Sequence, residues 1–153
     1  MAPPARCYLL DTNIVLHWTR AASPVATEIE RQFQLTASPF KPLICEVTLG
    51  EMLAFAKGRR WGSDRLARWA DVERRLTVIP IGDRRIHETY AELHTQAKDG
   101  GLAIQHDHND LWIAATARTA GACLLSTDSK AFLPLRATLD AVVLDAQTGV
   151  ALP

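Results

Sequence analysis

Short β-like runs alternate with longer helical segments along this chain, and that alternation limits the fold more than any other feature. Runs typical of strands cover residues 7–10, 42–44, 77–81, 123–125 and 141–144. Helical patterns lie between them, at 12–19, 23–34, 46–57, 63–76, 83–98 and 107–120. Strands that alternate with helices favour parallel β–α–β crossovers, with helices on both faces of the sheet. We therefore predict a three-layer α/β/α fold around a central, mainly parallel sheet of four to five strands.

Length and composition are typical of one soluble globular domain spanning residues 1–153. Hydrophobic residues make up 48% of the chain and charged residues 22%, and no apolar run approaches the roughly 20 residues of a membrane span. Residues 1–6 lack the apolar core of a secretory signal. The cysteines Cys7, Cys45 and Cys123 lie in apolar stretches without CxxC spacing, which argues against a disulfide framework. We expect a cytoplasmic protein that is not attached to a membrane.

Four acidic residues lie where such a fold would gather them. Asp11 and Asp128 each follow a predicted strand, and Glu51 and Asp110 lie near the starts of helices. In parallel sheets the ligand site lies beyond the carboxyl ends of the strands, so the four side chains should meet at one edge. One like-charge pair at ~4 Å costs about 4 kcal/mol at an effective dielectric constant of ~20. A fold that gathers carboxylates normally holds a divalent cation among them, so the four residues indicate a metal-dependent enzyme.

Helix capping offers a simpler explanation of each acid taken singly. Asp11 and Asp128 can cap the helical turns that follow them, and Asp110 can be the third residue of a helix capped three residues earlier. Glu51 can close a capping box with Thr48, although residues 47 and 49 look already helical. Taken together, these explanations require four unrelated caps to fall at converging positions.

The order and local context of the acids decide between these explanations. The four motifs are LLDTN at 9–13, EVTLGEM at 46–52, NDLWIAATA at 109–117 and LSTDSKAF at 125–132. Together they resemble the PIN-domain family over residues 9–132, and most closely the VapC-type toxins of bacterial toxin–antitoxin pairs. The first and third motifs are specific when they occur together. One departure is Cys45, where many relatives have Ser, and we expect it to alter a helix cap and not the chemistry.

The resemblance implies a PIN-like fold and an endoribonuclease that depends on Mg²⁺ or Mn²⁺. It makes Asp11, Glu51, Asp110 and Asp128 the catalytic residues and metal ligands, although the fourth acidic position varies in the family. One or two ions would activate the water that hydrolyses the RNA phosphodiester. A VapB-type antitoxin would block the site, and a homodimer and a heterotetramer or larger complex with the antitoxin are implied. The RNA target, the number of ions and the antitoxin class stay open.

Other polar residues near these motifs are candidates for supporting roles. Asn13 and Thr127 can orient the metal ligands, and ordinary turn roles explain them equally well. His106 and His108 alternate just before Asp110 and suggest zinc, but no cysteine lies nearby and further ligands would have to come from elsewhere. A polar loop that leads into a helix is the better explanation of the two histidines.

The charge distribution points to a polyanionic substrate although the net charge is zero. Residues 57–85 include nine basic and four acidic side chains, a surplus of five positive charges, which suits RNA approaching an acidic pocket. A solvated helix face explains the same surplus equally well. Lys57, Arg59, Arg60 and Trp61 are the candidate RNA-binding residues, with Trp61 exposed and able to stack on bases. Trp69 is expected in the core or at an interface.

Three alternative functions fit part of the pattern. A haloacid-dehalogenase-like phosphatase also begins with a strand that ends in Asp, but it needs a second Asp two residues later, where Asn13 stands. A receiver domain needs an acidic pair near its N-terminus and a lysine after a late strand, whereas Asp11 has no acidic neighbour and Lys130 follows Asp128. A catalytically weak PIN-like scaffold that binds RNA or protein is the third, and the presence of all four acids argues against it.

Overall fold

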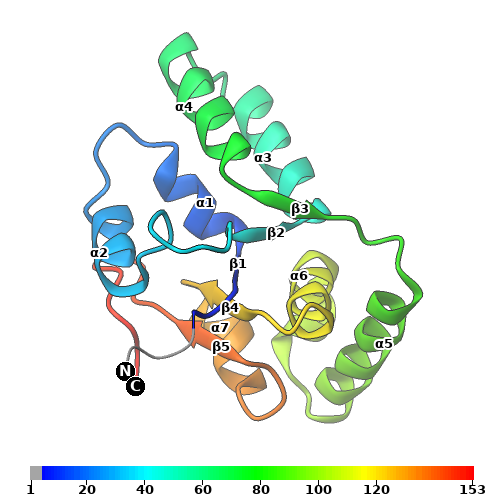
Figure 1. The fold of residues 1–153 in the computed structure, drawn as a ribbon. Coiled ribbons are helices and arrows are strands. Elements are labelled where there is room, and N and C mark those ends of the chain that lie inside the picture. The colour runs from blue at the N-terminus through cyan, green and yellow to red at the C-terminus, as the bar shows by residue number, and fades with distance from the viewer. Residues whose placement is uncertain (1–4) are drawn as a thin grey trace.

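A parallel sheet lies at the centre of the computed structural model, which describes residues 5–153 (Figure 1). The described strands are β1 (Tyr8–Leu10), β2 (Leu43–Cys45), β3 (Thr77–Ile79), β4 (Cys123–Ser126) and β5 (Ala141–Val143). They lie in the order β3-β2-β1-β4-β5, and each neighbouring pair is parallel. The predicted three-layer fold and strand number are confirmed. Most of the N-terminal segment considered above, residues 1–4, lies outside the described residues.

Helices cover both faces of the sheet. They are α1 (Thr12–Trp18), α2 (Pro24–Phe33), α3 (Glu46–Gly58), α4 (Ser63–Arg74), α5 (Arg84–Asp99), α6 (His108–Thr119) and the short α7 (Ser129–Phe132), with 3-10 turns at Ala103–His106 and Leu133–Leu135. Over residues 5–153, no helix combines the length and the apolar character that crossing a membrane requires.

Alternating side chains of the strands divide the core into two clusters. Leu9 and Leu124 pack with α5, α6 and α7 on one face. Leu10 and Leu125 pack with α1, α2, α3 and α4 on the other face. Successive strand residues point to opposite faces, and both faces are apolar here because helices cover both. The sheet is therefore buried on both sides, which leaves its carboxyl edge as the place where polar side chains can gather.

The element boundaries lie within a few residues of those predicted, because local signals set them. Ser23 caps α2 by accepting a hydrogen bond from the backbone amide of Ala26, and Pro24 occupies the first turn. Strand β3 ends at Ile79 and not at residue 81, since Pro80 has no amide hydrogen to donate. The 3-10 turn at Ala103–His106 was not predicted.

Candidate active site

Asp11 lies immediately after β1 and is the best anchored of the four acids. Its carboxylate accepts hydrogen bonds from the Thr12 amide at 2.7 Å, the Asn13 side-chain amide at 3.0 Å and the Ser126 hydroxyl at 2.6 Å. The residue is only 3% exposed. Burial raises the pKa of Asp11 to about 6, against the hydrogen bonds that lower it, and the charges of Glu51 and Asp128 raise it further. Asp11 thus caps α1, as the simpler explanation held, and also faces other acids.

Glu51 reaches from α3 toward α1 and α6. Its carboxylate accepts from the Thr12 hydroxyl at 2.6 Å and from the Asn109 side-chain amide at 3.3 Å. The prediction of a capping box between Thr48 and Glu51 is wrong, because α3 already begins at Glu46 and Thr48 lies inside it. The Thr48 hydroxyl lies 3.0 Å from the Thr12 hydroxyl. The cap position is held by Cys45, which makes no capping bond through its side chain. The Glu51 side chain is therefore committed to contacts between helices.

Asp110 lies in the first turn of α6, behind the N-cap residue Asp107. The Asp107 carboxylate accepts from the Asp110 amide at 3.1 Å, so the predicted cap is present. Asp110 is half-buried, and burial raises its pKa to about 8, with the charges of Asp11, Asp107, Asp128 and Glu51 adding to the shift. These charges act on Asp110 because the acids have come together in space, and Asp107 is a fifth member that the sequence identified only as a cap.

Asp128 follows β4 and is the fourth of the predicted acidic residues. Its carboxylate accepts from the Ala131 amide at 2.9 Å, which caps α7, and its own amide donates to the Ser126 hydroxyl at 2.9 Å. A small cavity of about 160 Å³ lies here, lined by Asp107, Asp110, Asp128 and Lys130 with three apolar neighbours. Asp107, Asp110 and Asp128 thus border one small cavity, which Asp11 and Glu51 do not line.

The ends of β1 and β4 are joined by polar side chains. The Asn13 side chain donates to Asp11 and accepts from the backbone amide of Thr127 at 3.1 Å. Thr127 contributes its main chain to this contact. Ser126, which sequence reasoning missed, bonds both Asp11 and the Asp128 amide. Its role could have been predicted from its position, because Ser126 ends a strand that lies next to β1. The same reasoning about strand ends placed Asp11 and Asp128 at this edge of the sheet.

The site fits a hard divalent cation in ligand type and charge. Mg²⁺ prefers oxygen ligands and is usually held by one or two carboxylates with several waters. A cation would relieve the repulsion that contributes to the raised pKa values of Asp11 and Asp110. Within residues 5–153, no three Asp, Glu, His or Cys side chains converge closely enough to hold one ion directly. Binding through one or two carboxylates and water is consistent with that spacing, and the metal-binding role of the four acids stays a prediction.

The expected exposure of Trp61 is wrong. Its side chain is 8% exposed and packs in the core cluster beneath α3 and α4. The guanidinium of Arg65 lies 4.0 Å from the ring centroid and covers the indole. A ring so enclosed has no free face for a nucleobase, whereas Trp69 is buried as expected.

The other three candidate RNA-binding residues lie at the far end of the helical pair α3 and α4. Lys57, Arg59 and Arg60 are exposed, and Arg59 lies over the Phe55 ring at 4.4 Å. Figure 1 shows α3 leading away from the sheet to this turn and α4 returning from it. Further along the basic stretch, Arg74 and Arg75 both pair with Asp71. The basic side chains of residues 57–85 are thus divided between separate surfaces.

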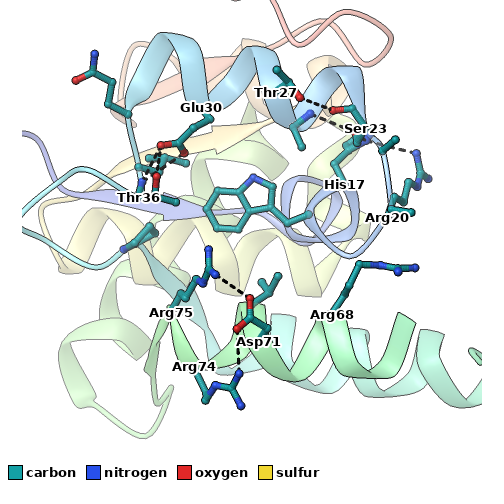
Figure 2. A pocket seen from close by; sticks show the side chains of 18 of the residues that line it. His17, Arg20, Ser23, Thr27, Glu30, Thr36, Arg68, Asp71, Arg74 and Arg75 are labelled. Atoms are coloured by element: carbon teal, nitrogen blue, oxygen red, sulfur yellow. Dashed lines mark hydrogen bonds and ion pairs between the residues drawn. The ribbon is translucent and has the colours of Figure 1, made fainter. Parts of the chain in front are cut away.

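A larger cavity, of about 1350 Å³, lies between α2 and α4 (Figure 2). Six Arg and Lys side chains and two acidic ones line it, together with Trp18. Figure 2 shows Arg68, Asp71, Arg74 and Arg75 on one side and Glu30 and Ser23 on the other. No residue lines both this groove and the small cavity at the acidic residues. The groove is therefore a second surface, distinct from the acidic site.

Comparison with known proteins places the fold. A model of the PIN domain matches residues 8–134, and no curated protein matches the chain significantly. Similar solved structures include VapBC2 from Rickettsia felis, with 23% identity over 91% of this chain and 99% of that chain, TM-score 0.76. FitAcB from Neisseria gonorrhoeae has 20% identity over 88% and 95%, TM-score 0.69. VapBC-1 from nontypeable Haemophilus influenzae has 22% identity over 90% and 97%, TM-score 0.68. At these identities the likeness shows a shared fold.

Proposed function

This chain belongs to the PIN-domain family, and we propose that it is a divalent-metal-dependent endoribonuclease, the toxin of a cytoplasmic toxin–antitoxin pair. Family membership supports a nuclease. The similar solved structures include a toxin–antitoxin complex from Klebsiella pneumoniae and a VapBC toxin–antitoxin pair from Mycobacterium tuberculosis. RNA as the substrate, the metal and the antitoxin are the parts of this proposal that experiments must test.

The observation that carries the proposal is the group of mutually repelling carboxylates at the carboxyl edge of the sheet. Asp11, Asp110 and Asp128 would hold Mg²⁺ or Mn²⁺, one or two of them directly and the rest through water, and Glu51 would bind the metal or orient the attacking water. One or two such ions supply water activation and charge neutralisation at the scissile phosphate. The hydrogen bonds of Thr12 and Asn109 fix the Glu51 carboxylate before substrate arrives.

Water is the nucleophile in this proposal, and the product carries a 5′-phosphate. The cysteine side chains near the sheet do not offer a thiolate: burial raises the pKa of Cys45, and it raises that of Cys123 to about 11. Ser126 already donates its hydroxyl hydrogen to Asp11 at 2.6 Å. These side chains therefore serve packing and positioning.

A cleavage assay on total RNA tests the enzymatic claim. The parent protein should cleave RNA with Mg²⁺ and stop when EDTA is added, and Asp11→Asn should reduce the rate by about 100-fold or more. Asp140→Asn is the matched control, since Asp140 is an exposed acid that precedes β5, at the opposite edge of the sheet. Cleavage that survives EDTA or Asp11→Asn would overturn the metal mechanism. RNA binding without cleavage would support the weakly catalytic scaffold instead, and phosphate release from a phosphomonoester would support a phosphatase.

Growth in the cell tests the toxin claim. Expression of the parent should arrest growth, Asp110→Asn should not, and co-expression of the neighbouring reading frame should restore growth if that frame encodes the antitoxin. A parent that causes no arrest, or an arrest equally severe with Asp110→Asn, would contradict the toxin role.

We propose that the antitoxin, besides blocking the acidic site, also contacts the groove between α2 and α4. Its surplus of cationic side chains suits a segment that carries acidic residues. Arg75→Glu should therefore weaken antitoxin binding, measured by calorimetry with the purified partner. Arg118→Glu is the control, because Arg118 also sits in a surface ion pair but on α6, outside the groove. Equal affinity of both variants would place the antitoxin elsewhere.

A further inference from the structure

Most arginines of this chain form ion pairs with Asp or Glu, and a minority do not. The paired ones are Arg6, Arg31, Arg74, Arg75, Arg84, Arg85 and Arg118. Within residues 5–153, the arginines that form no ion pair are Arg20, Arg59, Arg60, Arg65, Arg68 and Arg136. Four of these lie together, and we call them the arginine patch: Arg20, Arg59, Arg65 and Arg68. Positive charge on this surface therefore has no carboxylate to neutralise it.

Contacts with the end of α1 hold two members of the arginine patch in place. Arg65 donates to the Thr19 hydroxyl from Nε at 3.3 Å and from Nη2 at 3.2 Å, while its guanidinium covers the Trp61 ring. Arg68 donates from Nε to the Thr19 carbonyl at 2.9 Å. Both arginines are half-buried. Each guanidinium keeps further N–H groups that find no acceptor in the part of the chain that the structure describes.

The other two members of the arginine patch are exposed and come from other elements. Arg20 directly follows the α1 cap residue Thr19 and donates to the His17 Nδ1 at 3.4 Å. Arg59 follows α3 and lies over the Phe55 ring. Burial lowers the pKa of Arg65, and the charges of the other three members lower it further. The four guanidiniums are thus close enough to repel one another.

Helix capping explains part of the arginine patch but not its surplus of charge. A cation is favourable at the C-terminus of a helix, so the bond from Arg68 to the Thr19 carbonyl needs no ligand to explain it. One positive charge is enough for that role, whereas the patch brings several together. A guanidinium that is already fixed loses little further freedom on binding an anion, and its planar fork matches two phosphate oxygens. The patch therefore suits a ligand that carries several phosphate groups.

An RNA backbone fits the arginine patch better than an acidic peptide does. RNA carries a negative charge at every nucleotide, so one strand can reach guanidiniums that come from the ends of α1 and α3 and from α4. An acidic peptide would need carboxylates at matching spacings. Asp11 caps the start of α1 and Thr19 its end, and the helix between them is about 12 Å long. A phosphate at the patch would therefore be a different one from the phosphate at the acids.

We propose that the arginine patch binds the RNA backbone outside the acidic site, at a phosphate other than the scissile one. This inference rests on the proposed function, because it takes RNA as the substrate. Arg20 and Arg68 also line the groove between α2 and α4, and Figure 2 shows both at the right-hand side of the view, with Arg74 and Arg75 further to the left. An antitoxin in that groove would cover part of the patch and compete with RNA there.

Fluorescence anisotropy at several salt concentrations tests the charge contacts. The Asp11→Asn protein, which should not cleave, is titrated with Mg²⁺ present into a fluorescent single-stranded RNA oligonucleotide. Adding Arg65→Gln and Arg68→Gln should lower the slope of log K against log salt by about 1.4, since each lost phosphate contact contributes ~0.7 for a single strand. Adding Arg20→Gln alone should lower the slope by about 0.7 and leave the contacts of α4 with Thr19 intact.

Two control variants separate charge from packing. Arg84→Gln with Arg85→Gln removes the same charge from α5, where both arginines already pair with acids, and should leave the slope unaltered. Arg65→Lys with Arg68→Lys keeps the charge and should keep the slope. If the slope fell as far in the Lys variant as in the Gln variant, the effect would belong to the packing of α4 on α1, and the proposal would be overturned.

Neutralising single phosphates of the oligonucleotide locates the contact. One uncharged methylphosphonate outside the cleavage site, with a 2′-O-methyl group on the preceding ribose, should weaken binding to the Asp11→Asn protein. It should have no further effect once Arg65→Gln and Arg68→Gln are present, because the arginines and the phosphate report the same contact.

Several outcomes would contradict the arginine patch as an RNA contact. Equal losses from the methylphosphonate in both proteins would overturn the proposal, as would unchanged RNA affinity in all the Gln variants. Gln variants that keep RNA affinity but lose the purified antitoxin would assign the patch to the antitoxin instead. If the Asp11→Asn protein binds no RNA and the parent cleaves none, the proposed function itself fails.

Discussion

The Asp110 carboxyl group binds its proton more tightly in the folded chain than in the unfolded one. Burial and neighbouring acids raise its pKa from 3.8 to about 8, and they raise that of Asp11 to about 6. A raised carboxyl pKa means that the folded state holds more protons between about pH 4 and pH 8. The electrostatic cost of the metal-free site is therefore absent below about pH 4, grows through that window and is complete above about pH 8.

The metal-free protein should become more stable as the pH falls from 8.5 to 6. We expect Asp110→Asn to raise the melting temperature at pH 8.5 and to flatten its dependence on pH, because the buried charge is removed. Each kcal/mol corresponds to about 2–4 °C for a chain of this size. Thermal melts in EDTA measure both effects, and added Mg²⁺ should stabilise the parent more than the variant. If the melting temperature of the parent protein fell as the pH was lowered from 8.5 to 6, the raised pKa values would be contradicted.

Ser126 should matter to metal affinity although it is not itself an expected ligand. Its hydroxyl donates to the Asp11 carboxylate and accepts from the Asp128 backbone amide, so Ser126→Ala removes one contact to the Asp11 carboxylate and one to the backbone that carries Asp128. Groups that orient ligands typically contribute 10–100-fold to metal affinity, and we expect a loss of that size in a Mn²⁺ titration by calorimetry. Ser129→Ala, at an exposed position of α7, is the matched control. Unchanged affinity in Ser126→Ala would limit the hydroxyl to a structural role.

At the scale of elements, local sequence signals were enough to predict most of the helices and strands. The Ser23-Pro24 cap and the apolar strands needed no knowledge of distant contacts, so α2 and the sheet could be predicted. Asp11 and Asp128 could be placed because they follow strands whose ends share one edge of the sheet. The burial of Trp61 could not be predicted, since it depends on how α3 and α4 pack together. The capping box failed for a related reason: α3 begins directly after β2, with no loop between them.

The turn before the C-terminal residues depends on a close approach to α2. Gly149 has φ of +75°, and an added Cβ would lie 2.9 Å from the Val25 carbonyl oxygen. Gly149→Ala should therefore cost about 3 kcal/mol, combining left-handed backbone strain with overpacking. Gly121→Ala is the control, because Gly121 has φ of +65° but no neighbour within 4 Å of such a Cβ, so only about 1 kcal/mol is expected. Urea denaturation compares the two, and equal losses would remove the role of the contact.

At the scale of the whole molecule, a net charge of zero hides opposite charges on separate surfaces. The acids lie at the sheet edge, whereas Lys57, Arg59 and Arg60 lie at the far end of α3. Long-range attraction of RNA is thus expected to come from surfaces other than the site itself.

The salt dependence of RNA binding tests the contribution of the turn between α3 and α4, which carries Lys57, Arg59 and Arg60. Replacing Lys57, Arg59 and Arg60 by Ala should lower the slope of log K against log salt by about 2, since each lost phosphate contact contributes ~0.7 for a single strand. A triple variant of Arg6, Arg118 and Arg136, which are not in the basic stretch, carries the same charge change and should leave the slope unaltered. Identical slopes for the two triple variants would exclude the turn from RNA binding.

The hydrogen bond from Ser126 to Asp11 joins residues 115 positions apart, and this separation has a consequence during synthesis. When β1, α1 and α3 have been synthesised, the nascent chain contains Asp11 and Glu51. It does not yet contain Asp110, Ser126 or Asp128. The half-made chain therefore has no assembled site, however well its first helices fold. On the proposed function, the nascent protein stays harmless to the messenger and ribosome that produce it until β4 emerges and takes its place beside β1.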